Sequence, residues 1–390
     1  MNDKKVLVLF YDKKDREREV ENTVEPRTLE EDIKEAFKET GVKYEIRTAS
    51  PRHEPWLILE YMNEQKYDGI IVVAGLSCSL DIPNMVMQQL YDNQHIPIKP
   101  RDWQNVTFKR KDFHGNEITD EHGQTRTFKA SIDDMIKSVY FQQQRSVPII
   151  GVPTADEHTY GEFAFASMLM SSRPSSAACV PVGKAYQAAV LMSRLLTTPW
   201  NEVVTVMPDK DAKEYEKDGM PKIRSKGHQL GWEVTQLLDK EFTPYEDGKI
   251  PFHHESYADY MRQFMTGDTV DKRPPANRLH VCIYNDFFQL EDMNKLSEAI
   301  IGVYLPPKGQ KVNMLEFSKR IAIGTKLENV LHSRMGVSEN AAVLAAQALF
   351  IANPNLKPSR FTSLRQKKSQ GNVEEFLKLW KVKGINFEVG

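Results

Sequence analysis

Ser-Val-Pro-Ile-Ile-Gly-Val-Pro, residues 146–153, recurs later in the chain as Ser-Glu-Ala-Ile-Ile-Gly-Val-Tyr, residues 297–304. Downstream of the two copies, Gln187-Ala-Ala-Val-Leu191 matches Asn340-Ala-Ala-Val-Leu344. Self-similarity within a sequence marks repeated structural units. We therefore expect the chain to consist of two related halves.

A further pair of matching segments lies upstream. Tyr44-Glu45 is followed by the triplet Arg-His-Glu at 52–54, and Tyr245-Glu246 by His-His-Glu at 253–255. These segments are separated by more residues than the downstream pairs, so the first half should contain an insertion, which we place at about 95–145. The predicted domains are 1–200, with this insertion, and 201–390.

Strands and helices alternate along the chain. Val6–Phe10, Tyr67–Gly75 and Val147–Val152 are continuous apolar runs, which are typical of parallel strands buried on both faces. Helical apolar spacing follows in Leu29–Thr40 and in Lys184–Leu196. This order predicts an α/β fold, a three-layer sandwich around a parallel sheet.

The insertion and the second half show weaker patterns. In the insertion, Val106–Phe113 and Gln124–Lys129 flank turn residues and predict an exposed β-hairpin arm, serving as a lid, an oligomer contact or a plain surface feature. The second half should begin with a strand at Glu202–Met207. Helices are expected at Phe252–Phe264 and Ser338–Ala352.

Composition is that of an ordinary globular protein. The 390 residues are 40% hydrophobic and 27% charged, with a net charge of −2, which gives no general attraction to nucleic acid or anionic membranes. The longest apolar runs are too short to span a bilayer, and no signal-peptide pattern is present. Three scattered cysteines do not form a disulfide framework. We expect a cytoplasmic protein.

Polar residues follow three predicted strands of the first half, Val6–Phe10, Val42–Ala49 and Tyr67–Gly75. Ligands of parallel α/β sheets bind outside the carboxyl ends of the strands, where small-residue turns cradle phosphates. An arginine can clamp an anion, and a histidine can move protons near neutral pH. The candidates in these three loops are Asp15 in the first, Ser50, Arg52 and His53 in the second, and Ala74, Gly75, Ser77 and Ser79 in the third.

Four segments resemble the PurE family of phosphoribosylaminoimidazole carboxylases and mutases. Gly41–Tyr61 is similar to the family's Gly-x-x-Tyr-Glu strand followed by Ser-Ala-His-Arg-Thr-Pro, and Ala74–Met85 to its glycine loop. Val147–Pro153 resembles its Pro-Val-Ile-Gly-Val-Pro strand, and Asn340–Leu356 its C-terminal helix. The resemblance covers most of residues 1–200 and, more faintly, 201–370.

The resemblance implies a flavodoxin-like domain, here duplicated in tandem, that assembles into homo-oligomers; for this chain we expect a tetramer of fused pairs. It implies transfer of a carboxyl group, from carbon dioxide, bicarbonate or a carboxylated precursor, onto aminoimidazole ribonucleotide in purine biosynthesis, without a metal or an organic cofactor. In the second half, His253 falls on the catalytic histidine position; in the first half the candidate is the neighbouring His53. Asp15 and Ser50 match the family's substrate-binding Asp and Ser, and the third loop matches its phosphate loop.

Several residues depart from the family pattern. The family's His-Arg order is reversed in Arg52-His53, its Gly-Ser start is Tyr11-Asp12, and the second half has Tyr284–Phe288 in place of a glycine loop. Two alternatives therefore stay open. Val152-Pro-Thr154 resembles related carboxylases that act on a nicotinate dinucleotide, and decay of both sites would leave a nucleotide-binding or scaffold protein. We favour retained catalysis.

Overall fold

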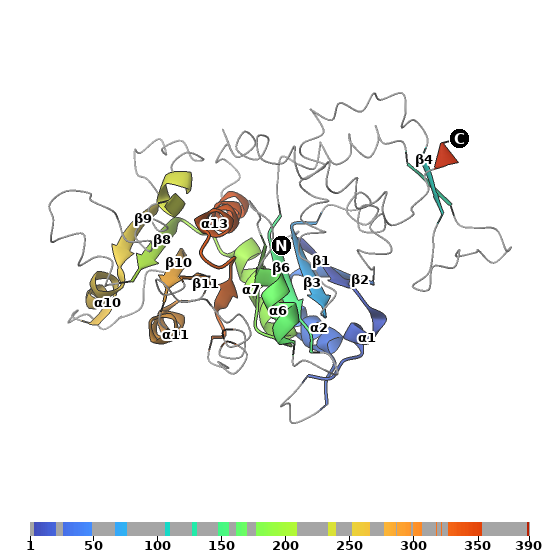
Figure 1. Cartoon of the computed structure of the whole chain (residues 1–390), viewed down its shortest axis with the longest axis horizontal. Helices are drawn as coiled ribbons and strands as arrows, with labels where there is room; N and C mark the ends of the chain where they lie inside the picture. Colours follow the sequence, from blue (N-terminus) through green and yellow to red (C-terminus); the bar gives the residue numbers. More distant parts are fainter. Residues whose placement is uncertain are drawn as a thin grey trace.

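The computed structural model is organised around one ten-stranded, mostly parallel β-sheet, which makes the fold α/β (Figure 1). The strand order is β2-β1-β3-β6-β7-β12-β11-β10-β8-β9. The structure describes residues 4–20, 26–48, 67–75, 106–109, 127–130, 147–155, 161–169, 177–208, 233–238, 252–265, 277–285, 287–297, 299–305, 317, 321, 327–352 and 388–389.

Five parallel strands from residues before 200 form one half of the sheet. Val6, Val8 and Phe10 pack on one face and Leu7 and Leu9 on the other, and all five are fully buried, as the apolar run predicts. A strand covered on both faces has no polar side to alternate with. The strands are β1 (Lys5–Phe10), β2 (Lys43–Thr48), β3 (Gly69–Ala74), β6 (Ile149–Pro153) and β7 (Ala177–Cys179).

Five strands from residues after 200 form the other half, and they are again parallel to one another. In each half the strands lie in the spatial order second, first, third, fourth, fifth. The strands of this half are β8 (Glu202–Met207), β9 (Phe252–Ser256), β10 (Arg278–Tyr284), β11 (Ile300–Tyr304) and β12 (Val330–His332).

The two half-sheets join through β7 and β12, which run antiparallel and pair at Cys179 and His332. The thiol of Cys179 also donates to the carbonyl oxygen of His332, at 3.6 Å. Because the strands of one half run opposite to those of the other, their carboxyl ends lie at opposite edges of the sheet.

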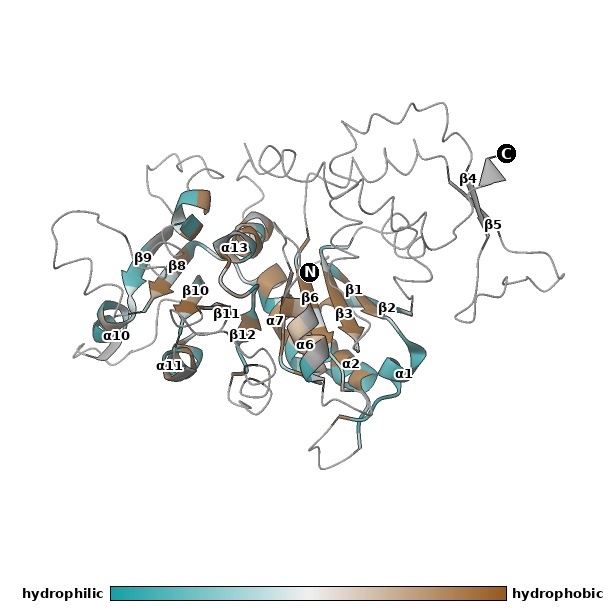
Figure 2. Ribbon diagram, viewed as in Figure 1, coloured by the Kyte–Doolittle hydropathy of each residue, from teal (hydrophilic) through white to brown (hydrophobic). Residues whose placement is uncertain are grey.

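Helices cover both faces of this sheet. Helices α2, α7 and α13 bury apolar residues in one core cluster that runs through both halves, and Trp200, 1% exposed, belongs to it. Figure 2 shows the hydrophobic strands β1 and β3 beside the hydrophilic α1. The helices are α1 (Lys13–Arg16), α2 (Leu29–Thr40), α6 (Glu162–Leu169), α7 (Ala185–Thr197), α10 (Tyr257–Met265), α11 (Phe287–Leu296) and α13 (Ser338–Ala352). Within the residues that the structure describes, none of the helices has the length and apolar character needed to cross a bilayer.

The hairpin predicted in the insertion is confirmed. Strands β4 (Val106–Lys109) and β5 (Thr127–Ala130) pair antiparallel. A short C-terminal strand, β13 (Glu388–Val389), adds to β4, which the sequence did not predict. Figure 1 shows this small sheet set apart from the ten-stranded one.

One predicted element of the second half is wrong at its start. Phe252–Phe264 was expected to be a single helix, but Phe252–Ser256 is the edge strand β9, and α10 begins only at Tyr257. His253 therefore lies inside a strand, paired in register with Val204.

Candidate functional site

The carboxyl ends of four neighbouring strands meet at one edge of the first half. Phe10, at the end of β1, is in register with Thr48 of β2 and Val73 of β3, and Ala74 is in register with Pro153 of β6. The loops that carry the candidate residues therefore leave the sheet side by side. This is the place where open parallel sheets bind ligands.

Asp15 lies at this edge, on the short helix α1. Asp12 caps the helix by accepting from the amide of Lys14, at 2.9 Å. Asp15 is only 5% exposed, and its Oδ1 accepts the hydroxyl hydrogen of Thr154, at 2.8 Å. The bond connects the loop after β1 with the loop after β6. Both side-chain contacts of Asp15 with described residues, from Thr154 and from Arg18, are made at Oδ1.

Burial raises the pKa of Asp15, because a carboxylate loses hydration when it leaves water. Two contacts oppose the shift: the hydrogen bond from Thr154 and the positive charge of Arg18, whose Nε lies 3.8 Å from Oδ1. Both stabilise the ionised carboxylate. Asp15 is thus a shielded acceptor whose charge depends on these neighbours.

Thr154 also explains why glycine follows β3. Its amide donates to the carbonyl oxygen of Ala74, at 3.0 Å, and a Cβ at Gly75 would lie 3.3 Å from its hydroxyl oxygen. Gly161, at the start of α6, has φ +81°, and a Cβ there would lie 2.4 Å from Cγ1 of Val182. The loops after β3, β6 and β7 therefore pack closely against one another at the strand ends, and we call these three loops the floor of the candidate site.

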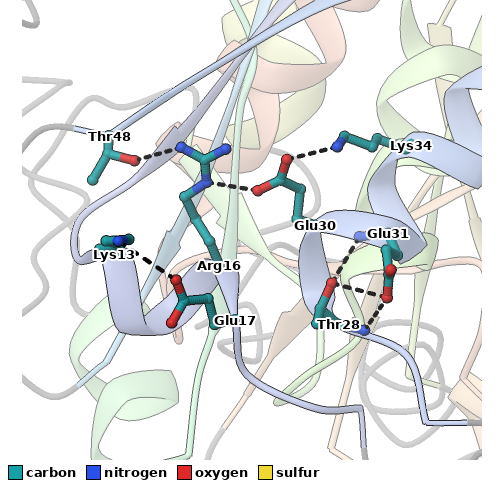
Figure 3. A network of polar contacts seen from close by, with 8 residues as sticks. All are labelled: Lys13, Arg16, Glu17, Thr28, Glu30, Glu31, Lys34 and Thr48. Carbon is teal, nitrogen blue, oxygen red and sulfur yellow. Dashed lines mark hydrogen bonds and ion pairs between the residues drawn. The ribbon is translucent and has the colours of Figure 1, made fainter.

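A network of charged residues borders this floor (Figure 3). Arg16 donates from Nε to Glu30 at 2.6 Å and from Nη1 to Thr48 at 3.3 Å, and Lys34 pairs with Glu30 at 2.7 Å. The hydrogen bond from Arg16 lowers the pKa of Glu30. Arg16 thus holds the end of β2 next to α2. The pair of Lys34 with Glu30 has the i,i+4 spacing of a helix and can be predicted from the sequence. The contacts of Arg16 join separate elements and cannot be predicted in this way.

Three of the predicted site residues are described at this edge: Asp15, Ala74 and Gly75. Asp15 and Gly75 both approach Thr154, which the sequence had singled out only for the dinucleotide alternative. The other predicted residues of the first half, Ser50, Arg52, His53, Ser77 and Ser79, lie outside the described residues.

His253 is not brought to this edge. It lies in β9, the outermost strand on one side of the ten-stranded sheet. Strand β2, which leads to the loop of His53, is the outermost strand on the other side. Neighbouring strands are about 4.8 Å apart, so the two edge strands are separated by on the order of 40 Å. A single site within one chain therefore does not combine Asp15 with His253.

The corresponding strand ends of the second half are filled by side chains. Leu305 donates its amide to the carbonyl oxygen of Tyr284 at 2.7 Å, as Thr154 does to Ala74 in the first half. The Tyr284 ring is 1% exposed, and a Cβ at Gly302 would lie 3.2 Å from it. The bulk that the sequence predicted at Tyr284 is thus buried, and Leu305 occupies the position that Thr154 has in the first half.

Metal and thiol chemistry have few candidates in the described part of the chain. No three His, Cys, Asp or Glu side chains gather there in a way that would hold a metal ion. Cys179 and Cys282 are free and buried, and burial raises the pKa of both thiols, that of Cys282 to about 12. Such thiols are poor nucleophiles at neutral pH.

Comparison with known proteins identifies no relative. No protein-family model matches the sequence, and no curated protein matches it significantly.

Proposed function

We propose that the chain is a divergent, tandemly duplicated member of the PurE-like carboxylases, with a flavodoxin-like arrangement in each half. Two observations support the duplication: both halves have the spatial strand order second, first, third, fourth, fifth, and matching sequence segments occupy β6 and β11. This is the order of flavodoxin-like sheets. The proposed reaction is carboxylation, or carboxyl migration, on aminoimidazole ribonucleotide.

One observation carries the proposal: the buried carboxylate of Asp15, tied to Thr154 beside the Gly75 turn, at the joined carboxyl ends of β1, β3 and β6. A shielded carboxylate suits a ribose hydroxyl, because a charged acceptor forms a strong hydrogen bond when it is shielded from water. In this proposal His53, which follows β2, moves the proton at the reacting carbon.

The proposed site belongs to the first half, because the second half has Tyr284 and Leu305 at the equivalent strand ends. Each chain should therefore bind one nucleotide. The expected homo-oligomer, a tetramer of fused pairs, is tested by light scattering of the full chain.

The direct test is incubation of the purified chain with aminoimidazole ribonucleotide and bicarbonate, with the carboxylated product followed by absorbance and mass spectrometry. His53→Ala and Asp15→Asn should abolish turnover without unfolding the protein, whereas His254→Ala, at an exposed position of β9, serves as the control. Loss of turnover in His253→Ala would indicate a site completed by another molecule. Tight binding without turnover in the unmodified chain would refute catalysis and favour a nucleotide-binding protein; selective binding of a nicotinate dinucleotide would favour the related carboxylases.

A further inference from the structure

The N-terminus of α2, which follows β1 at this edge, is a poor site for a phosphate. Helix α2 is closed at its N-terminus by a capping box, in which Thr28 accepts from the amide of Glu31 and Glu31 accepts from the amide of Thr28. These bonds occupy amides that would otherwise face an anion, and Glu31 adds a negative charge. An anion beside the N-terminus of α2 would therefore depend on side chains.

Arg16 and Arg18 lie on the segment that follows β1, and their environments differ. The guanidinium of Arg16 already donates two hydrogen bonds, from Nε to Glu30 and from Nη1 to Thr48. Arg18 has its Nε buried without a hydrogen-bond partner, 3.8 Å from Oδ1 of Asp15, while its side chain is 33% exposed. The guanidinium of Arg18 thus extends from the buried carboxylate towards solvent, with an unused donor.

We infer that Arg18 is the anion-binding residue of this site and takes the phosphate monoester of the nucleotide. The inference rests on the proposed function in taking the ligand to be a nucleotide. A guanidinium matches phosphate oxygens in a planar, two-donor geometry, and a donor that is buried and unused costs free energy until an acceptor arrives. Asp15, next to it, would accept from the sugar.

Arg18 therefore supplies the charge that the loop after β1 lacks. That loop has Tyr11 and Asp12 where the resembling family has a Gly-Ser turn, and Asp12 carries a negative charge. Two groups of opposite charge, Asp15 and Arg18, would then divide the nucleotide between them: the carboxylate binds hydroxyl groups and the guanidinium binds phosphate.

The test compares one nucleotide with its nucleoside. Calorimetry on the full chain measures the affinity for aminoimidazole ribonucleotide and for the dephosphorylated riboside, in the unmodified protein, in Arg18→Met and in Lys14→Met. Lys14 is exposed on the neighbouring helix α1, so its variant removes an equal charge that is not paired with Asp15. We expect Arg18→Met to weaken nucleotide binding about 10- to 100-fold more than riboside binding, as loss of a charged hydrogen bond to phosphate predicts. Equal weakening of both ligands, or an equal effect of Lys14→Met, would overturn the inference.

A second measurement separates this inference from the proposed substrate. Inorganic phosphate is titrated into labelled protein while the side-chain Nε–H resonance of Arg18 is followed by NMR. A saturable shift supports an anion site even if the ribonucleotide fails to bind, in which case only the substrate is wrong. No shift at millimolar phosphate would overturn the assignment of Arg18.

Discussion

Protonation of His332 should destabilise the junction between the two half-sheets. His332 is 2% exposed, and its ring contacts elements of both halves: Phe165 of α6, edge to face at 5.8 Å, and the hydroxyl of Tyr284 in β10, 3.4 Å from Nδ1. Its Nε2 is buried with no hydrogen-bond partner. The side chains that contact its ring, Phe165 and Tyr284, carry no negative charge, so neither supplies a counter-ion to an imidazolium.

Burial lowers the pKa of His332 from 6.5 to about 3. The unfolded chain therefore binds a proton between these two values that the folded protein does not, so stability falls as pH decreases below 6.5. At 1.36 kcal/mol per pKa unit, the full difference is about 5 kcal/mol, and the part lost between about pH 7 and pH 5 is about 2 kcal/mol.

The measurement is urea-induced unfolding of the full chain, followed by tryptophan fluorescence across this pH range. His332→Phe keeps an aromatic ring against Phe165 and removes the titrating group, so we expect its loss of stability between about pH 7 and pH 5 to be smaller by about 2 kcal/mol. The control is His254→Phe, at an exposed position, which should retain the pH dependence of the unmodified chain. An identical slope in His332→Phe and in the unmodified chain would refute the reasoning.

Two further predictions concern the floor of the candidate site. Thr154→Val removes the hydroxyl that stabilises the Asp15 carboxylate and should raise the pKa of Asp15, measured by carbon-13 NMR. Thr154→Ser keeps the hydroxyl and should leave the pKa of Asp15 unchanged. An unchanged pKa of Asp15 in the valine variant would contradict this prediction. Gly161→Ala should cost about 1–2 kcal/mol for left-handed backbone plus a clash with Val182, whereas Gly183→Ala, with φ +70° and open space, should incur the backbone cost alone. Equal unfolding midpoints in denaturant for the two alanine variants would argue against the clash.

Strands β1, β3 and β6 of the first half were predictable because each is buried on both faces. A continuous apolar run such as Val6–Phe10 has few other stable environments in a globular protein. Strand β9 was missed for the opposite reason: Phe252-His-His-Glu-Ser is polar, and an edge strand pairs on one side only. Its residues carry no strong period, so the helical pattern of α10 was extended over them.

The sequence predicted where the candidate site lies but not the contacts within it. The loops after the parallel strands were correctly expected to leave from one edge, but the contacts that give the site its chemistry join distant residues. The Thr154–Asp15 bond spans 139 positions, and nothing in either local segment indicates the other. Likewise, an apolar strand pattern does not reveal the direction of the neighbouring strand, so the antiparallel pairing of β7 with β12 could not be foreseen.

The antiparallel pairing of β7 with β12 gives a reason why the second half would be retained although side chains fill the carboxyl ends of its strands. Strand β7 would be an edge strand without β12, and Ala177–Cys179 would then expose unpaired backbone N–H and C=O groups, which promote aggregation. The shared core cluster makes the dependence stronger, because α7 of the first half and α13 of the second bury their apolar residues in it together. Under the proposed duplication, selection on the site of the first half also maintains the fold of the second. The second copy could then lose its own site residues while the surfaces that cover β7 and α7 stayed apolar.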